Sequence, residues 1–133
     1  PYKYKERIVT STTKEYSILF RLDEQYLIRS EARAQQNDIS GAQDDLNKIR
    51  HRAGLNATQA SNTADLLEAI LKERRIELFS ESGHRWFDLK RMKKANSVLS
   101  LVKPNWNAED ILLPIPESEI LVNPNLKPQN AGY

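Results

Sequence analysis

Apolar residues recur every three or four positions along the chain, and this spacing is the feature that most constrains the fold. A helix has 3.6 residues per turn, so residues at this spacing lie on one of its faces. Asp38 or Ser40 can cap such a helix at its start, and Gly54 is the residue type that commonly ends one. The clearest series consists of Ile39, Ala42, Leu46, Ile49 and Ala53.

A second helical face precedes this one, and a short polar turn at residues 37–40 separates the two. The small residues at the carboxy-terminal end of this first helix, Ser30 and Ala34, would let another helix approach closely. Two helices joined by a short turn form an antiparallel hairpin. This first helix is predicted to begin at Ser17, and its face consists of Leu19, Leu22, Tyr26, Leu27, Ser30 and Ala34.

The hairpin plan then occurs again. Asn62 or Thr63 can cap a third helix, and Gly83 interrupts the pattern before a fourth helix over residues 84–95. The third helix carries Leu66, Leu67, Ile70, Leu71, Leu78 and Phe79, and the fourth carries Trp86, Phe87, Leu89 and Met92. We expect Trp86 to belong to the core. Two stacked hairpins are typical of tetratricopeptide-like packing.

The two ends of the chain lack a helical period. Residues 1–16 are predicted to be extended or loop and to continue an upstream region, which leaves residues 17–133 as one helical domain. The tail, residues 97–133, contains Pro114, Pro116, Pro124 and Pro128, which disfavour a long helix or a central strand. Its apolar residues are Ile111, Leu112, Leu113, Ile115, Ile120, Leu121 and Leu126. The sequence therefore predicts an all-α fold of about four helices, with an extended proline-rich tail packed across them.

Composition excludes several functional classes. The chain has 20 basic and 18 acidic residues, a balance that argues against nucleic-acid binding. It has no cysteine, which excludes disulfides and thiolate chemistry. Its histidines, His51 and His84, are not at metal-ligand spacing, and its glycines are isolated, so we predict neither a metal nor a cofactor.

Charged residues cluster around the predicted turn at Gly83. Glu73, Glu77 and Glu81 are four residues apart and share one helix face, whereas a glycosidase needs two carboxylates facing each other about 5–9 Å apart across a cleft. We therefore predict that the protein is not an enzyme. Asp88 is placed to meet Arg74 or Arg75, and arginine forks pair well with carboxylates. We expect a structural cluster that pins this corner, consisting of Glu73, Arg74, Glu77, Glu81, Arg85 and Asp88.

Three stretches of the sequence together resemble one family. The first is ERRIELFSESGHRWFDLKR, the second is LLPIPESEILVNPNLKPQNAGY, and the third is the hairpin with LFRLDEQYLIRSEARAQQ and DDLNKIRHRAGL. Over about residues 17–133, and in the order in which the family has them, these stretches resemble the carboxy-terminal region of the SusD/RagB family. The chain departs from the pattern at Ser82, which precedes Gly83 where the family often has Glu-Gly, and at Ser30, which replaces an alanine.

The resemblance implies a role as well as a fold. Family members are glycan-binding lipoproteins at the cell surface of Bacteroidetes. They bind oligosaccharides without cleaving them and deliver them to a TonB-dependent, SusC-like transporter in the outer membrane. An amino-terminal lipidated cysteine anchors them, and this chain contains none. Members are several hundred residues long, so the chain resembles their last quarter.

The resemblance does not transfer any sugar-binding residue, because the matching motifs belong to the scaffold. Sugar recognition needs an exposed aromatic face with hydrogen-bonding groups beside it. Trp106 in the polar segment KPNWNAED, with Asn105, Asn107 and Asp110, is the candidate. The alternative for Trp106 is that it packs the tail onto the helices. The alternative for the whole chain is a scaffold for protein–protein interaction, since paired helices present a concave surface suited to peptides.

Overall fold

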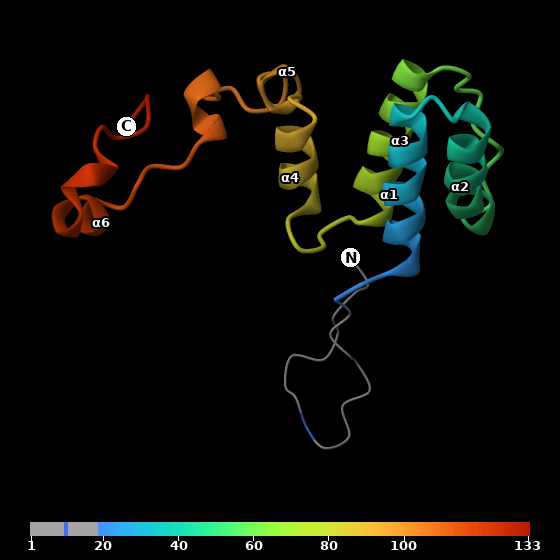
Figure 1. The fold of residues 1–133 in the computed structure, drawn as a ribbon, viewed down its shortest axis with the longest axis horizontal. Coiled ribbons are helices and arrows are strands. Elements are labelled where there is room, and N and C mark those ends of the chain that lie inside the picture. Colours follow the sequence, from blue (N-terminus) through green and yellow to red (C-terminus); the bar gives the residue numbers. More distant parts are fainter. Residues whose placement is uncertain (1–9, 11–18) are drawn as a thin grey trace. The chain divides into compact units, whose positions relative to one another are not determined.

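The computed structural model describes Thr10 and residues 19–133, and in these residues the protein is helical, without a β-strand (Figure 1). The predicted all-α class is therefore confirmed. The chain forms two compact units, Pro1–Glu73 and Arg74–Tyr133. The predicted loop at residues 1–16 lies outside the described residues except for Thr10, and the boundary at residue 17 stays a prediction. The helices are α1 (Leu22–Gln35), α2 (Ile39–Arg52), α3 (Thr63–Glu77), α4 (His84–Arg91), α5 (Ala95–Leu99) and α6 (Glu117–Val122), with 3-10 helices η1 (Ala108–Ile111) and η2 (Pro124–Leu126).

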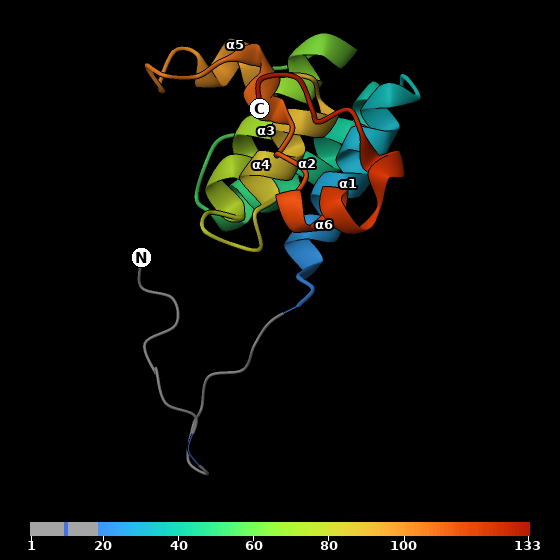
Figure 2. The ribbon, with the colours of Figure 1, turned by 90° about the vertical axis from the view of Figure 1, so that its left-hand side faces the viewer.

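Helices α1 and α2 form the predicted hairpin, visible in two orientations (Figures 1 and 2). The Asp38 carboxylate caps α2, because its Oδ1 accepts a hydrogen bond of 2.9 Å from the amide of Gly41. Helix α1 begins at Leu22 and not at Ser17, since Arg21 is extended, with φ −119° and ψ 138°. Leu19 therefore does not share the buried face, and it is 82% exposed.

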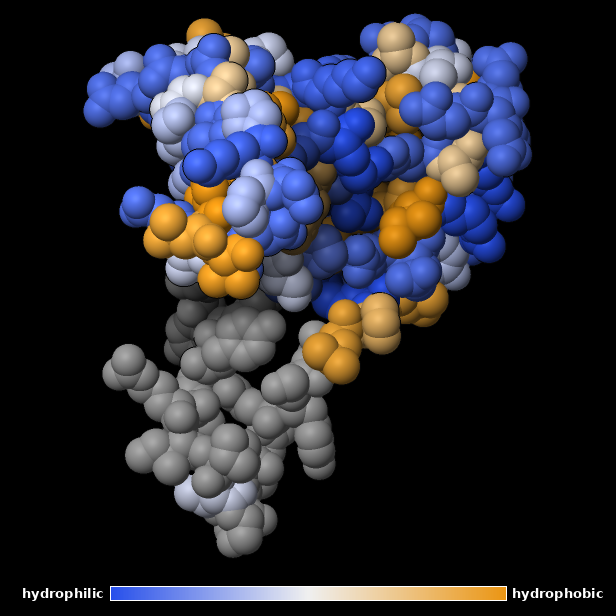
Figure 3. Space-filling model, turned by 60° about the vertical axis from the view of Figure 1, so that its left-hand side comes forward, coloured by the Kyte–Doolittle hydropathy of each residue, from blue (hydrophilic) through white to orange (hydrophobic). Residues whose placement is uncertain are grey.

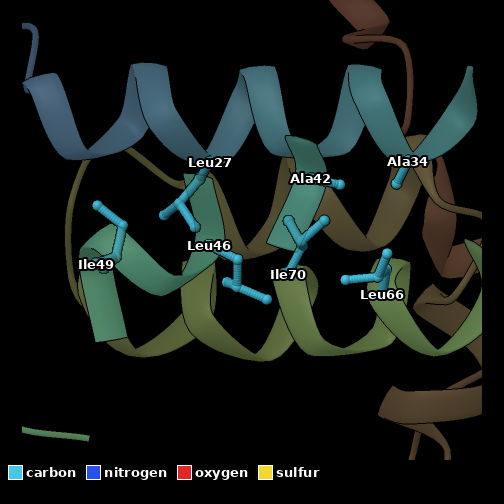
Figure 4. Close-up of a cluster of buried hydrophobic side chains, with 7 residues drawn as sticks. All are labelled: Leu27, Ala34, Ala42, Leu46, Ile49, Leu66 and Ile70. Carbon is cyan, nitrogen blue, oxygen red and sulfur yellow. The ribbon is translucent and has the colours of Figure 1, made fainter. Parts of the chain in front are cut away.

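The core of the first unit joins three helices (Figure 4). Alanines occupy the end of the hairpin near its turn, where Ala34 and Ala42 are fully buried and allow the helix backbones to come close. The buried hydroxyl of Ser30 donates a hydrogen bond of 2.7 Å to the carbonyl of Ala42, so its burial leaves no polar group unsatisfied. The cluster consists of Leu27, Ala34, Ala42, Leu46, Ile49, Leu66 and Ile70.

A buried carboxylate also ties α1 to α2. Asp45 of α2 is 1% exposed, and its oxygens accept hydrogen bonds of 2.7 Å from both Nε and Nη2 of Arg29. A third bond of 2.8 Å comes from Nη1 of Arg33, which also donates to the carbonyl of Gly41 at 3.1 Å. The hydrogen bonds from Arg29 lower the pKa of Asp45 against the opposing effect of burial.

This lowered pKa predicts an acid-sensitive hairpin. A carboxylate whose pKa is lower in the folded state stabilises the fold fully at pH values above its pKa in the unfolded state. This stabilisation is lost as the pH falls from that pKa through the pKa of the folded state. The loss should begin as the pH falls towards 3.8, the ordinary pKa of an aspartate side chain. We expect Asp45→Asn to lower the free energy of unfolding at pH 7 by about 1–3 kcal/mol and to flatten its decline below pH 4, measured by urea unfolding at a series of pH values. If the free energy of unfolding of the variant declined as steeply below pH 4 as that of the unmodified protein, the role given to Asp45 would be contradicted.

Helix α3 is capped by Asn62, whose Oδ1 accepts a hydrogen bond of 3.0 Å from the amide of Asp65. The helix ends at Glu77, earlier than the sequence pattern predicted. Left-handed residues then follow, with φ of 61° at Ser80, 40° at Ser82 and 73° at Gly83. Glu81 therefore lies in this turn and not on the helix face that it was predicted to share with Glu73 and Glu77.

The second unit contains two short helices, α5 and α6, in addition to the helices that the sequence predicted. Helix α6 is only six residues long and lies between Pro116 and Pro124, where the prolines were predicted to disfavour a long helix. The apolar tail residues are only partly covered. Ile111, Ile115, Ile120 and Leu126 are half-buried, whereas Leu112, Leu113 and Leu121 are exposed. Figure 3 shows hydrophobic residues at the surface between hydrophilic ones.

Side-chain hydrogen bonds close the tail upon itself. Gln129 donates from Nε2 to the carbonyl of Ile115 and accepts at Oε1 from the amide of Ile115, both at 2.8 Å. Asn130 donates to the carbonyl of Leu113 at 2.7 Å, and the Tyr133 hydroxyl donates to the carbonyl of Leu112 at 3.0 Å. A primary amide offers both a donor and an acceptor, so it can serve a segment whose prolines lack amide protons.

Candidate functional site

Two tryptophans of the second unit lie in contact, and we call them the tryptophan pair. Trp86 comes from α4 and Trp106 from the loop after α5, and their ring centroids are 6.1 Å apart in an edge-to-face arrangement with an interplanar angle of 75°. Such a geometry is a favourable one for aromatic rings. Both side chains are half-buried, so Trp86, which was predicted to be a core residue, is only partly enclosed.

The ring of Trp106 is held in place by polar groups. Its Nε1 donates a hydrogen bond of 3.0 Å to Oδ1 of Asn96 in α5. The ammonium of Lys103 lies 5.9 Å from the centroid of the Trp106 ring, and that of Lys90 lies 5.3 Å from the centroid of Trp86. These distances are within the range of a cation–π interaction. The tryptophan pair is therefore held by one amide and two cations.

An open pocket of about 430 Å³ lies beside Trp106. The pocket is lined by three of the residues that were predicted to contact a sugar, Asn105, Trp106 and Asp110, and also by Lys103. Asn107, the fourth candidate, does not line the pocket. The backbone amide of Asn107 donates a hydrogen bond of 2.8 Å to Oδ2 of Asp110 and so holds that carboxylate at the start of η1.

Lys90, Asn96 and Lys103 were not predicted from the sequence to be part of this site. One signal was available, because Lys90 follows Trp86 by four residues in the same helix, and residues at this spacing are neighbours. No comparable signal exists for Asn96, which reaches Trp106 across the loop between them.

The charged cluster that was predicted to pin the corner is divided among different partners. Glu73 is 4% exposed and pairs with Arg50 of α2, whose Nη1 lies 3.0 Å from its Oε2. This pair joins α2 to α3 within the first unit. Glu77 is half-buried at the end of α3, and Glu81 lies in the turn that follows. Both have interactions with other residues.

The centre of the cluster in the second unit is Asp88. Its Oδ2 accepts a hydrogen bond of 2.8 Å from Nε of Arg74, and the two side chains are 4% and 5% exposed, respectively. Its Oδ1 accepts bonds of 3.0 and 2.9 Å from Nε and Nη2 of Arg91, whose side chain is 42% exposed. Asp88 thus joins the end of α3 to α4, as its position in the sequence suggested.

Arg85 differs from the other members of the cluster. Neither Arg85 nor Arg75 has a hydrogen-bonded carboxylate among the residues that the structure describes. Burial lowers the pKa of Arg85, the positive charge of Arg75 lowers it further, and Asp88 acts in the opposite direction. In the part of the chain that the structure describes, Arg85 therefore has no hydrogen bond or ion pair in the corner that it was predicted to pin.

Within the described part of the chain, no group of three or more histidine, cysteine or acidic side chains is arranged to hold a metal ion. The chemistry that the second unit offers is that of aromatic faces, amides and lysine or arginine cations. These groups suit the recognition of a polar ligand with apolar faces.

Comparison with known proteins identifies the family. The model of the SusD family matches residues 2–133, which is nearly the whole chain. The chain belongs to the SusD family. The chain is similar to SusD-like protein P2 of Formosa agariphila, with 36% identical residues over 87% of this chain and 26% of that protein. SusD-like protein P38 of the same organism is 30% identical over 98% of this chain and 27% of that protein.

A solved SusD-like structure supports the same conclusion. The crystal structure of a SusD-like protein from Bacteroides fragilis superposes with a TM-score of 0.70 and 34% identity, over 84% of this chain and 25% of that one. The chain thus spans about a quarter of the length of the SusD-family proteins that it matches. The motifs on which the resemblance was based lie within the matched residues.

Proposed function

We propose that the protein binds oligosaccharides or polysaccharides at the surface of a bacterial outer membrane, without cleaving them, and passes them to a SusC-like TonB-dependent transporter. The observation that carries this proposal is the match to the SusD family over residues 2–133. Attachment through an amino-terminal lipid is part of the proposal. Of the helices in the described part of the chain, none is long and apolar enough to cross a membrane.

Within this chain, we propose that the pocket beside Trp106 contacts the glycan. Its volume of about 430 Å³ is sufficient for one sugar residue or two. The half-buried indole offers an apolar face for the C–H groups of a sugar ring, while Asn105 and Asp110 offer an amide and a carboxylate to its hydroxyls. Lys103 lies over the ring of Trp106, so a stacked sugar would displace its ammonium, which could then bond the ligand.

This proposal predicts retardation of the protein in affinity electrophoresis through gels that contain starch, xylan, pectin or alginate. We expect at least one polysaccharide to slow the protein. Trp106→Ala should weaken binding to that polysaccharide about tenfold, which corresponds to 1.4 kcal/mol, because a buried aromatic contact is a frequent hot spot. The same incubations should release no new reducing ends, since the binding is proposed to be non-enzymatic.

A matched control separates binding from folding. Leu101 is 83% exposed near the pocket without lining it, so Leu101→Ala should bind as the unmodified protein does. Circular dichroism would establish that both variants remain helical. Absence of retardation on the whole panel would contradict glycan binding and favour a protein-interaction scaffold. Retardation that Trp106→Ala leaves unchanged would contradict only the role of this pocket.

A further inference from the structure

A second pocket of the same unit lies at the turn between α3 and α4. It has a volume of about 390 Å³, and its lining includes Arg75, Phe79, Glu81, His84 and Arg85. Nothing in the proposed function uses this pocket. It does not include Trp106 or any of the side chains around it.

The two arginines make the pocket unusual in charge. Elsewhere in the described chain, arginines near buried carboxylates are paired with them, as Arg74 is with Asp88 and Arg50 with Glu73. Arg75 and Arg85 line one pocket, and neither has a hydrogen-bonded carboxylate among the described residues.

The electrostatics of Arg85 agree with this arrangement. Burial and the charge of Arg75 both lower its pKa, which means that its positive charge is partly desolvated and is repelled by a like charge. Asp88 offsets this in part, but the hydrogen bonds of Asp88 go to Arg74 and Arg91. An anion placed between the two guanidinium groups would relieve the repulsion.

The other titratable groups of the lining do not fill this role. Glu81 and His84 each take part in an interaction. Glu81 lies in the turn, and its backbone amide donates a hydrogen bond of 3.1 Å to the carbonyl of Leu78. His84 is the first residue of α4. The amino end of α4 adds a partial positive charge to this side of the pocket.

An aromatic ring completes the pocket. The Phe79 side chain lies just beyond the end of α3 and is 61% exposed, although the sequence pattern placed it on a buried helix face. An exposed phenyl ring offers a flat apolar surface, and guanidinium groups bind carboxylates through two parallel hydrogen bonds. A uronic acid carries both complementary features, an apolar ring face and a carboxylate.

We propose that this pocket binds the uronic acid residue of an acidic glycan, with Arg75 and Arg85 on the carboxylate and Phe79 against the sugar ring. This inference rests on the proposed function, since it assumes that the ligand is a glycan. It adds a charge preference to that function, and the carboxylate of Glu81 in the lining would disfavour a ligand with densely spaced anionic groups.

The test is a titration of the protein with D-glucuronate, followed by nuclear magnetic resonance of the arginine Nε–Hε groups. We expect the signals of Arg75 and Arg85 to shift with glucuronate, while D-glucose at the same concentration leaves them in place. Arg75→Met and Phe79→Ala should each weaken the affinity about tenfold, as expected for loss of a charge-assisted hydrogen bond or of an aromatic contact. Arg91→Met is the matched control, because Arg91 is an exposed arginine outside the pocket, and it should not change the affinity.

Several results would overturn the inference. These are the absence of a shift with glucuronate, an equal effect of Arg91→Met, or an equal response to acetate, which carries the carboxylate without the sugar ring. Because glucuronate is tested apart from the polysaccharide panel, the two proposals can fail separately. Retardation by a neutral polysaccharide without a glucuronate response would leave glycan binding in place and remove the acidic subsite.

Discussion

Replacing Asp88 by alanine is expected to lower the free energy of unfolding of the second unit by about 3–5 kcal/mol. The Arg74 side chain is 5% exposed and donates to Asp88 at 2.8 Å, so the variant leaves its charge buried without this partner. A buried charge that loses its counter-ion cannot recover its hydration, which is why one half of such a pair costs more to remove than the whole pair. Both tryptophans lie in this unit, so urea unfolding followed by tryptophan fluorescence measures the effect there.

Arg91 provides the control for this prediction. It bonds the same carboxylate through two nitrogens, but its side chain is 42% exposed and can be hydrated when the bond is lost. Arg91→Ala should therefore cost less than about 1 kcal/mol. The double variant Arg74→Met with Asp88→Leu should recover part of the stability, since replacing a whole buried pair by apolar residues is often close to neutral. Equal costs for Asp88→Ala and Arg91→Ala would show that the buried pair does not hold this corner.

The helices of the hairpin could be predicted from sequence because their signals are local. The series from Ile39 to Ile49 has the helical period, and Asp38 and Gly54 mark its ends, so residue spacing alone locates α2. The start of α1 could not be predicted in this way. Leu19 continues the apolar period, but the backbone at Arg21 is extended, so the helix begins only at Leu22 and does not include Leu19.

Contacts between distant residues could be predicted only in part. The sequence placed Asp88 near Arg74 because the two helices are joined by a short turn. It gave no sign that Asp45 would meet Arg29 and Arg33, because that contact depends on how α1 and α2 are aligned along each other. The same holds for Arg85, which shares a charged segment with Arg74 but faces a pocket.

The candidate site was predictable in composition and not in geometry. A tryptophan among asparagines and an aspartate indicated sugar-binding chemistry, and the structure places Asn105, Trp106 and Asp110 around one pocket. The contact of Trp106 with Trp86, by contrast, depends on the path of the loop after α5. The left-handed residues Ser80 and Ser82, which shape the turn beside the second pocket, are also residue types that rarely adopt this conformation.

In the first unit, Leu46→Ala is expected to lower the free energy of unfolding by about 2–5 kcal/mol. The Leu46 side chain is fully buried at the centre of the cluster that joins α1, α2 and α3 (Figure 4). Truncation removes apolar area from this core and also leaves a cavity, because the helices on either side are held by the bonds of Asp45 and Glu73 and can relax only in part. Amide hydrogen exchange in α1 and α2 measures the loss for this unit by itself.

Leu22 is the matched control for Leu46, since it is the same residue type in the same hairpin but is 70% exposed. Leu22→Ala should change the free energy of unfolding by no more than about 0.5 kcal/mol. Leu46→Met, which conserves volume, should cost less than about 1.5 kcal/mol. If Leu46→Ala left exchange in α1 and α2 as slow as Leu22→Ala does, the stability of the hairpin could not come from this core. It would then have to come chiefly from the carboxylates that bridge its helices.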